Sequence, residues 1–165
     1  MSQIPWGIEK NLENSLVDFL TDEFTGKTVF LKGANQSIDI RVGNAYQDNW
    51  SMPCISIYAD TETDDKPFIG NNVLLKSHLM IIDIRATDGG MRSDLKDYLV
   101  DIISNGFPYY EYNPNPGEPD ESNKALVGKA SIKFISNVPI RNTQDSNYVE
   151  KFRQQITINV TIASA

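Results

Sequence analysis

Hydrophobic residues recur at three- and four-residue spacing in two parts of the chain. In the first part the apolar positions are Ile8, Leu12, Leu16, Phe19 and Leu20. This spacing places them on one face of a helix, so it predicts an amphipathic helix over 8–24 with one buried face. Gly26 stands just beyond the predicted end, where a left-handed glycine commonly caps a helix.

The second helical pattern begins near Met91 and ends at Asn105-Gly106. Its apolar stripe consists of Met91, Leu95, Tyr98, Leu99, Ile102 and Ile103. The preceding Asp88-Gly89-Gly90 lies between a strand and this helix, where a phosphate can rest on helix amides. The rest of a nucleotide-binding fingerprint is missing, so we interpret these residues as a strand-to-helix turn.

Five other segments show strand patterns, over 37–42, 53–59, 73–87, 130–139 and 152–162. The third is apolar on both faces, which is typical of a strand covered on both sides, so we expect it in the centre of the sheet. The last alternates apolar and polar residues. Its polar face carries no charge apart from Arg153, which favours packing beside a neighbouring copy.

The predicted order of elements is helix, three strands, helix, loop and two strands. This order predicts an α+β fold with a mostly antiparallel sheet and two helices packed on one face, α-β-β-β-α-β-β. A domain typically holds roughly 100–200 residues. We therefore expect residues 1–165 to form a single domain.

The chain is acidic, with 22 Asp and Glu against 15 Lys and Arg and a formal net charge of −7. Duplex DNA is held mainly by Lys and Arg that neutralise phosphates, so this balance argues against a sequence-reading DNA-binding protein. No stretch approaches the roughly 18 consecutive apolar residues of a membrane span. The amino terminus lacks the pattern of a secretion signal. We expect a cytoplasmic origin and no membrane partner.

Residue types that commonly carry catalysis or bind metals are scarce. Cys54 is the only cysteine and His78 the only histidine, which excludes an intrachain disulfide and zinc sites built from cysteines or paired histidines. We interpret Cys54 as a small core residue. His78 shares a strand face with Met80, Ile82 and Ile84, so we expect a packed histidine with satisfied hydrogen bonds.

A run of acidic residues opens a predicted loop over 60–72. Its carboxylates include Asp60, Glu62, Asp64 and Asp65. A calcium-binding EF-hand needs Gly at the sixth position and Glu at the twelfth, whereas this run has Asp65 and Asn71 there. We interpret the run as a solvated loop and a candidate contact surface for a neighbouring subunit or another partner.

The stretch over 107–123 holds four prolines and four aromatic residues. This composition argues against a helix or a central strand, so we expect a long loop or arm, which compact domains seldom carry without a use. Its aromatic residues are Phe107, Tyr109, Tyr110 and Tyr112. Such side chains anchor interfaces, and two alternatives stay open: contact with a neighbouring subunit, or folding back onto their own core.

The layout resembles the tail terminator proteins of long-tailed bacteriophages, also called tail-to-head joining or minor tail proteins. The resemblance rests on the first amphipathic helix, the proline-led strand over 52–58 with its acidic loop, the segments over 79–86 and 95–99, and the closing strand over 152–162. It covers nearly the whole chain in the order of elements. The arm over 107–123 is longer than the family pattern.

The resemblance implies a virion structural protein that forms a ring, usually hexameric, on the end of a completed tail tube. Such a ring stops tube polymerisation, joins the tail to the head connector and, in contractile tails, contacts the last sheath ring. DNA passes through it as cargo, and an acidic subunit suits a lumen that does not grip DNA. The resemblance implies no enzyme activity, no cofactor and no metal.

Two other functions stay open. A different neck or tail-tube component has the same general build, but tube proteins polymerise with themselves. A small hydrolase or ligand-binding domain would use His78, Asp83 and Arg85, of which the last two share one strand face and can pair.

Overall fold

The computed structural model describes residues 7–31, 34–43, 51–65, 75–112, 124–140 and 152–164. Within these ranges, the side chains of 29–31, 34–36, 61–65, 75–76 and 163–164 lie outside the description. The elements in chain order are α1 (Ile8–Phe24), β1 (Val29–Leu31), β2 (Ala34–Gln36), β3 (Asp39–Val42), β4 (Cys54–Asp65), β5 (Leu75–Arg85), α2 (Gly89–Ile103), β6 (Phe107–Tyr112), β7 (Lys124–Ile140) and β8 (Arg153–Ser164).

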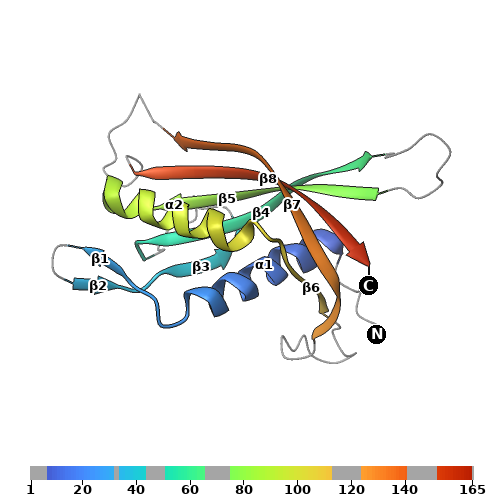
Figure 1. Ribbon diagram of the computed structural model, residues 1–165, viewed down its shortest axis with the longest axis horizontal. Coiled ribbons are helices and arrows are strands. Elements are labelled where there is room, and N and C mark those ends of the chain that lie inside the picture. Colours follow the sequence, from blue (N-terminus) through green and yellow to red (C-terminus); the bar gives the residue numbers. More distant parts are fainter. Residues whose placement is uncertain are drawn as a thin grey trace.

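Six of these strands form one sheet in the order β3-β4-β5-β8-β7-β6, which curls into a half-barrel (Figure 1). Every neighbouring pair in it is antiparallel except β3 with β4, which run parallel. The α+β class, the mostly antiparallel sheet and the central place of β5 are therefore confirmed. The predicted strand order is incomplete, because it lacks β6 and the separate β1–β2 hairpin.

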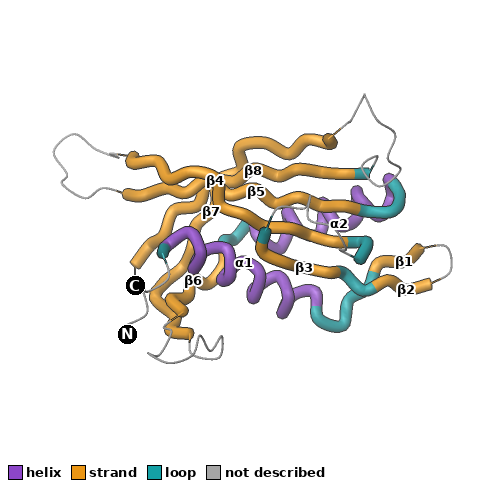
Figure 2. The backbone as a smooth tube through the Cα atoms, turned by 180° about the vertical axis from the view of Figure 1, so that it is seen from behind, coloured by secondary structure: helices purple, strands orange, loops and turns teal. Residues whose placement is uncertain are grey.

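The two helices supply apolar side chains to one buried cluster with the sheet, but they occupy different places. α2 packs over β5 and β8, whereas α1 packs against β6, β4 and β3, where the half-barrel curls toward it. The prediction of two helices packed on one face thus differs in detail from the structure. Figure 2 shows the opposite face of β5 and β8, over which no described helix lies.

Local signals set the helix ends. Gly26 follows α1 with a φ of 73°, as the sequence predicts. At the start of α2 the Asp88 carboxylate accepts a hydrogen bond from the Met91 backbone N–H at 2.8 Å, which satisfies one of the free amides of the first turn. This capping residue explains why α2 begins at Gly89, two positions before the predicted start.

The predicted arm over 107–123 is wrong in its first part, because Phe107–Tyr112 forms β6 and pairs with β7. Proline is tolerated in an edge strand, and among the described strands only β7 pairs with β6, which accommodates Pro108. Gly106 joins α2 to β6 with a φ of 78°, and a Cβ there would lie 2.2 Å from the Ala130 carbonyl oxygen. Residues 113–123 lie outside the described residues.

The predicted acidic loop is also corrected, because β4 continues through Asp65 in register with β5. The ladder with β5 satisfies the backbone groups of this segment and outweighs the low strand propensity of Asp and Glu. Asp60 is exposed, at a bulge between Ala59 and Thr61. The side chains of Glu62, Asp64 and Asp65 lie outside the described residues.

Candidate functional site

The three residues considered for hydrolysis do not converge. His78 and Asp83 lie on opposite faces of β5, since successive residues of a strand alternate between faces. His78 shares the face of Met80 and Ile82 and is 1% exposed, so the packed histidine is confirmed. The prediction that its hydrogen bonds are satisfied is wrong, because neither ring nitrogen of His78 has a hydrogen-bond partner in the described part of the chain.

Asp83 is held by an arginine from the neighbouring strand. The Nε of Arg153 on β8 donates to both Asp83 carboxylate oxygens, at 2.7 and 2.8 Å, and its Nη2 donates as well. Both side chains are buried. The sequence offered Arg85 as the partner of Asp83, but the two-pronged contact comes from Arg153, which only the strand order brings near. A buried, fully paired carboxylate of this kind has a structural role.

Cys54 is buried, and burial raises the pKa of its thiol to about 11, although nearby Arg85 acts to lower it. The thiol is therefore protonated at neutral pH and is a poor nucleophile. This supports the interpretation of Cys54 as a core residue. Among the described side chains no group of three or more His, Cys, Asp and Glu is placed to hold a metal ion.

The aromatic residues of β6 mostly fold back onto their own core. Phe107, Tyr109 and Tyr112 are buried, and the Phe107 ring stacks against Phe19 at 6.4 Å between centroids. Tyr110 is half-buried, with the Lys124 ammonium 4.7 Å from its ring centroid. Contact of these residues with a neighbouring subunit stays a prediction.

Polar residues of α1 close the outer edge of β6. Ser15 is fully buried, and its Oγ accepts from the Tyr110 N–H at 2.9 Å and lies 3.3 Å from the Tyr110 carbonyl oxygen, to which it can donate. The Asn11 Oδ1 accepts from the Tyr112 N–H at 3.4 Å. These contacts occupy backbone groups that an edge strand otherwise leaves open. They also explain two buried polar residues on a helix face that the sequence pattern treated as apolar.

Asp18 of α1 fixes the same corner from its side. Its Oδ2 accepts from the Tyr112 hydroxyl at 2.5 Å and from the Lys124 ammonium at 2.7 Å. The hydrogen bond to Asp18 raises the pKa of Lys124. The β6–β7 corner is thus tied to α1 by side chains of both strands.

The second half of β7 has an edge that no described strand covers. β6 pairs only with the first half, up to Ala130. From Ser131 to Ile140, β7 pairs with β8 on one side, and no described strand lies on its other side (Figure 1). The sequence suggested β8 as the strand beside a neighbouring copy, but β8 lies inside the sheet, between β5 and β7. Among the described strands, the second half of β7 and the outer side of β3 have open edges instead.

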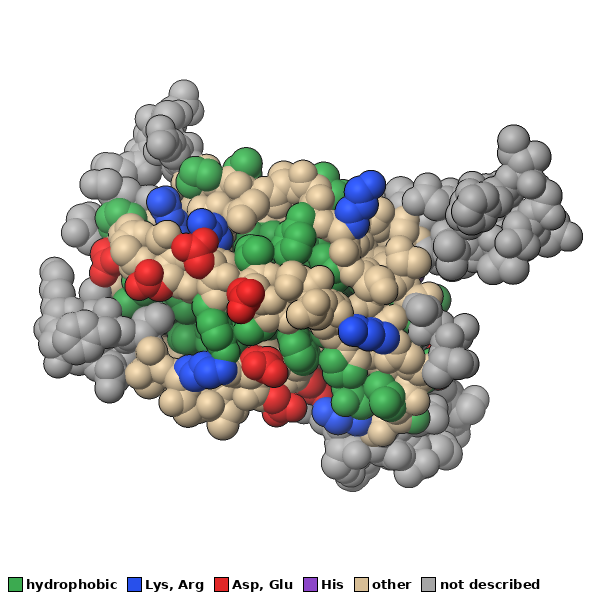
Figure 3. Space-filling view, viewed as in Figure 1, with side chains coloured by type: hydrophobic (Ala, Val, Ile, Leu, Met, Phe, Trp, Pro, Cys, Tyr) green, Lys and Arg blue, Asp and Glu red, His purple; other side chains and the backbone are tan. Residues whose placement is uncertain are grey.

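Apolar side chains gather on this strand. The exposed large hydrophobic residues of the described chain are Ile8, Val42, Leu126, Phe134, Ile135 and Val138, four of them on β7. Phe134, Ile135 and Val138 are 37%, 55% and 45% exposed. Figure 3 shows hydrophobic side chains along the upper rim, where the second half of β7 runs. Phe134 stands opposite Ile158 and Val138 opposite Gln155, so these two side chains lie on opposite faces of the sheet along one strand. Apolar side chains on both faces of an open strand edge suit contact with another chain.

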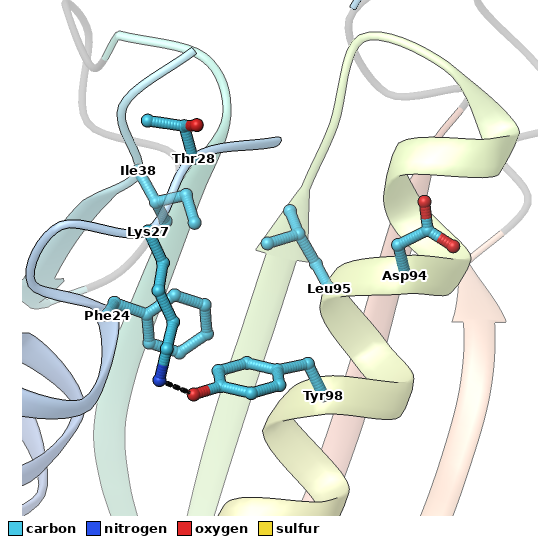
Figure 4. Close-up of a pocket in the computed structure, with 7 residues that line it drawn as sticks. All are labelled: Phe24, Lys27, Thr28, Ile38, Asp94, Leu95 and Tyr98. Atoms are coloured by element: carbon cyan, nitrogen blue, oxygen red, sulfur yellow. Dashed lines mark hydrogen bonds between the residues drawn. The ribbon is translucent and has the colours of Figure 1, made fainter. Parts of the chain in front are cut away.

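A pocket of about 320 Å³ lies between the end of α1 and α2 (Figure 4). It is lined by Phe24, Lys27, Thr28, Ile38, Asp94, Leu95 and Tyr98. The Phe24 and Tyr98 rings meet edge to face at 5.0 Å, and the Lys27 ammonium donates to the Tyr98 hydroxyl and the Glu23 carbonyl. The lysine is thus already engaged within the chain, and the remaining lining combines apolar side chains with the polar Thr28 and Asp94.

No family model matches this chain, and no curated protein matches it either. None of the described helices has the length and apolar character needed to cross a membrane.

Proposed function

We propose that this protein is a virion structural subunit that assembles into a closed ring on the end of a bacteriophage tail tube. The ring is usually hexameric in the family that the sequence resembles. It stops polymerisation of the tube, joins the tail to the head connector and lets DNA pass. The observation that carries the proposal is the open, apolar edge of β7, which fits a subunit that meets other protein chains.

The state of the ionisable residues supports a structural role over the hydrolase alternative. The only histidine is packed in the core on the opposite strand face from Asp83, and that carboxylate is bound by Arg153. The only cysteine is buried and protonated at neutral pH. Nucleophilic catalysis needs a nucleophile, a base and an orienting group in contact, and these residues do not provide that arrangement.

The charge of the chain also fits the proposal. A net charge of −7 repels the phosphates of DNA, so a ring of such subunits can surround a moving genome without gripping it. A second candidate is a tail-tube or other neck component, because an open strand edge serves continuous polymerisation as well as ring closure.

The experiment is electron microscopy of isolated tail tubes mixed with gold-labelled protein. We expect gold at one end of each tube only, at the end that receives the head. Gold along the whole tube would assign the protein to the tube instead, and tubes without gold at their ends would contradict the proposal. Bovine serum albumin carrying the same label controls for unspecific adhesion.

A further inference from the structure

We infer that the subunits join by strand addition: the open edge of β7 in one copy pairs with the outer edge of β3 in the next copy. The inference rests on the proposed ring and names the surfaces that close it. The occupant of the β7 edge is thus a second copy of this chain.

The outer edge of β6 is covered by side chains, whereas the edge of β7 over 131–140 is open in the described part of the chain. At β6, the buried Asn11 and Ser15 side chains bind the outward backbone groups. Along 131–140 of β7, no described side chain or strand takes that place. Proteins usually protect edge strands because open backbone groups pair with other chains. An edge left open beside a closed one therefore fits a pairing surface.

The charge along the β7 edge favours a copy of the same chain. Between 131 and 140 the sequence holds one lysine, Lys133, and no Asp or Glu, whereas the chain carries a net −7. Two acidic copies repel each other over most of their surface, and this edge is a stretch where the second copy meets a positive charge. Pro139 has no N–H to donate, so the usable edge runs from Ser131 to Val138.

β3 offers the matching edge at the other end of the sheet. It pairs with β4 on one side, and no described strand lies on its other side. Val42 is 38% exposed there, and Asp39 places a carboxylate on the helix-free side of the sheet. Lys133 lies on that same side, since it stands opposite Asn159 of β8. Asp39 and Lys133 share one sheet face, and the Asp39 carboxylate is paired with Arg41 of the same strand at 2.8 Å, so this edge of β3 offers Lys133 an ion pair without net charge.

Strand direction favours this pairing as well. β3 runs parallel to β4, and three successive antiparallel pairings from β4 to β7 make β7 run opposite to both. A rotation about an axis along the strands preserves their direction, so β7 meets the β3 of the next copy antiparallel, the slightly more stable arrangement. Phe134 and Val42 then lie on the same helix-facing side, opposite Ile158 and Ile57 respectively.

Pairing of two different edges also explains closure. A contact between unlike surfaces repeats from copy to copy and closes into a ring when the rotation allows. Pairing of β7 with β7 would use the same surface twice and end at a dimer. The β7–β3 contact is therefore the one that a ring needs.

The test uses variants with one added cysteine each and a short bismaleimide crosslinker. Native Cys54 is buried and its thiol is protonated at neutral pH, so the wild-type protein serves as the blank. Val42→Cys and Phe134→Cys proteins are mixed in equal amounts and treated. We expect a crosslinked dimer from the mixture and at least tenfold less from either variant alone. Circular dichroism checks the fold, and Ile135→Cys replaces Phe134→Cys if that variant does not fold.

Leu126→Cys is the matched control, because Leu126 is 65% exposed on the same strand but lies where β6 holds the edge. Its mixture with Val42→Cys should give little dimer. Equal crosslinking by the control, or efficient crosslinking of Phe134→Cys alone, would overturn the β7–β3 pairing.

Light scattering of the mixture without crosslinker measures the mass of the assembly independently of the crosslink. An assembled protein without the Val42–Phe134 crosslink overturns the strand pairing and leaves the proposed ring standing. A mass of one chain in every mixture overturns both.

Discussion

At the scale of single residues, the buried polar side chains of the described sheet strands include an ion pair and groups without a partner. Asp83 and Arg153 neutralise each other inside the sheet. His78 and Ser56 are buried with polar atoms that have no hydrogen-bond partner in the described part of the chain. The first kind links two neighbouring strands that are 70 positions apart in the sequence, whereas the second lowers stability without adding specificity.

The Asp83–Arg153 pair gives a direct prediction. Asp83→Asn leaves a buried guanidinium without its counter-charge, so we expect a loss of about 3–5 kcal/mol in the free energy of unfolding. Replacing both residues by apolar ones, Asp83→Leu with Arg153→Met, should restore most of that loss. Urea denaturation followed by circular dichroism measures both variants. A double variant as unstable as the single one would contradict the account of the pair.

Glu13 gives a prediction that depends on pH. Its Oε1 accepts from the Ala59 N–H at 2.7 Å, and burial raises the pKa of this carboxyl above its ordinary value of 4.5, although the hydrogen bond lowers it in part. A pKa raised by folding means that the folded state binds the proton more readily, so ionised Glu13 lowers stability at neutral pH and this loss fades as the pH falls through the folded pKa.

Glu13→Gln keeps an oxygen acceptor at this position without the charge. We expect a higher melting temperature at neutral pH and a smaller gain at about pH 4. Glu9→Gln removes a charge from the first turn of the same helix, where negative charge is favourable, and should give no gain. Thermal unfolding at both pH values decides, and a gain that grows toward acid would show that burial does not govern this carboxyl.

At the scale of elements, the sequence predicts what depends on neighbouring residues and misses what depends on distant ones. The 8–24 helix is confirmed as α1, because its periodicity is local. β6 is missed, because its prolines argue against a strand while its partners come from β7 and from Ser15, which is 95 positions away from Tyr110. The open edge is missed for the same reason. Phe134 and Val138 alternate like core residues in the sequence, and nothing local shows that β6 pairs only with the first half of β7.

The turn between α2 and β6 gives a prediction at this scale. Gly106 and Gly26 both have a positive φ, but a Cβ at Gly106 would strike the Ala130 carbonyl, whereas a Cβ at Gly26 meets no atom within 4 Å. Gly26→Ala should therefore cost about 1 kcal/mol from backbone strain alone. Gly106→Ala should cost about 3 kcal/mol or more, because β6 must also move from β7. Chemical denaturation compares them, and equal losses would show that the close approach is unimportant.

At the scale of the whole molecule, the sheet has a covered edge, at β6, and an open edge, along the second half of β7 in the described part of the chain. α1 binds the outward edge of β6, and the curled sheet buries one continuous core. The second half of β7 carries exposed apolar residues on an otherwise acidic chain. A closed ring of subunits joined at this edge would bury those residues and leave no edge open.

The measurement that tests this account most directly is the absolute mass of the purified protein by light scattering across a wide range of concentration. The account predicts a rise to a plateau at a whole-number multiple of the 18.5 kDa chain that is larger than a dimer, because a ring stops growing once it closes. A mass of 18.5 kDa at every concentration, or growth without a plateau, would contradict it.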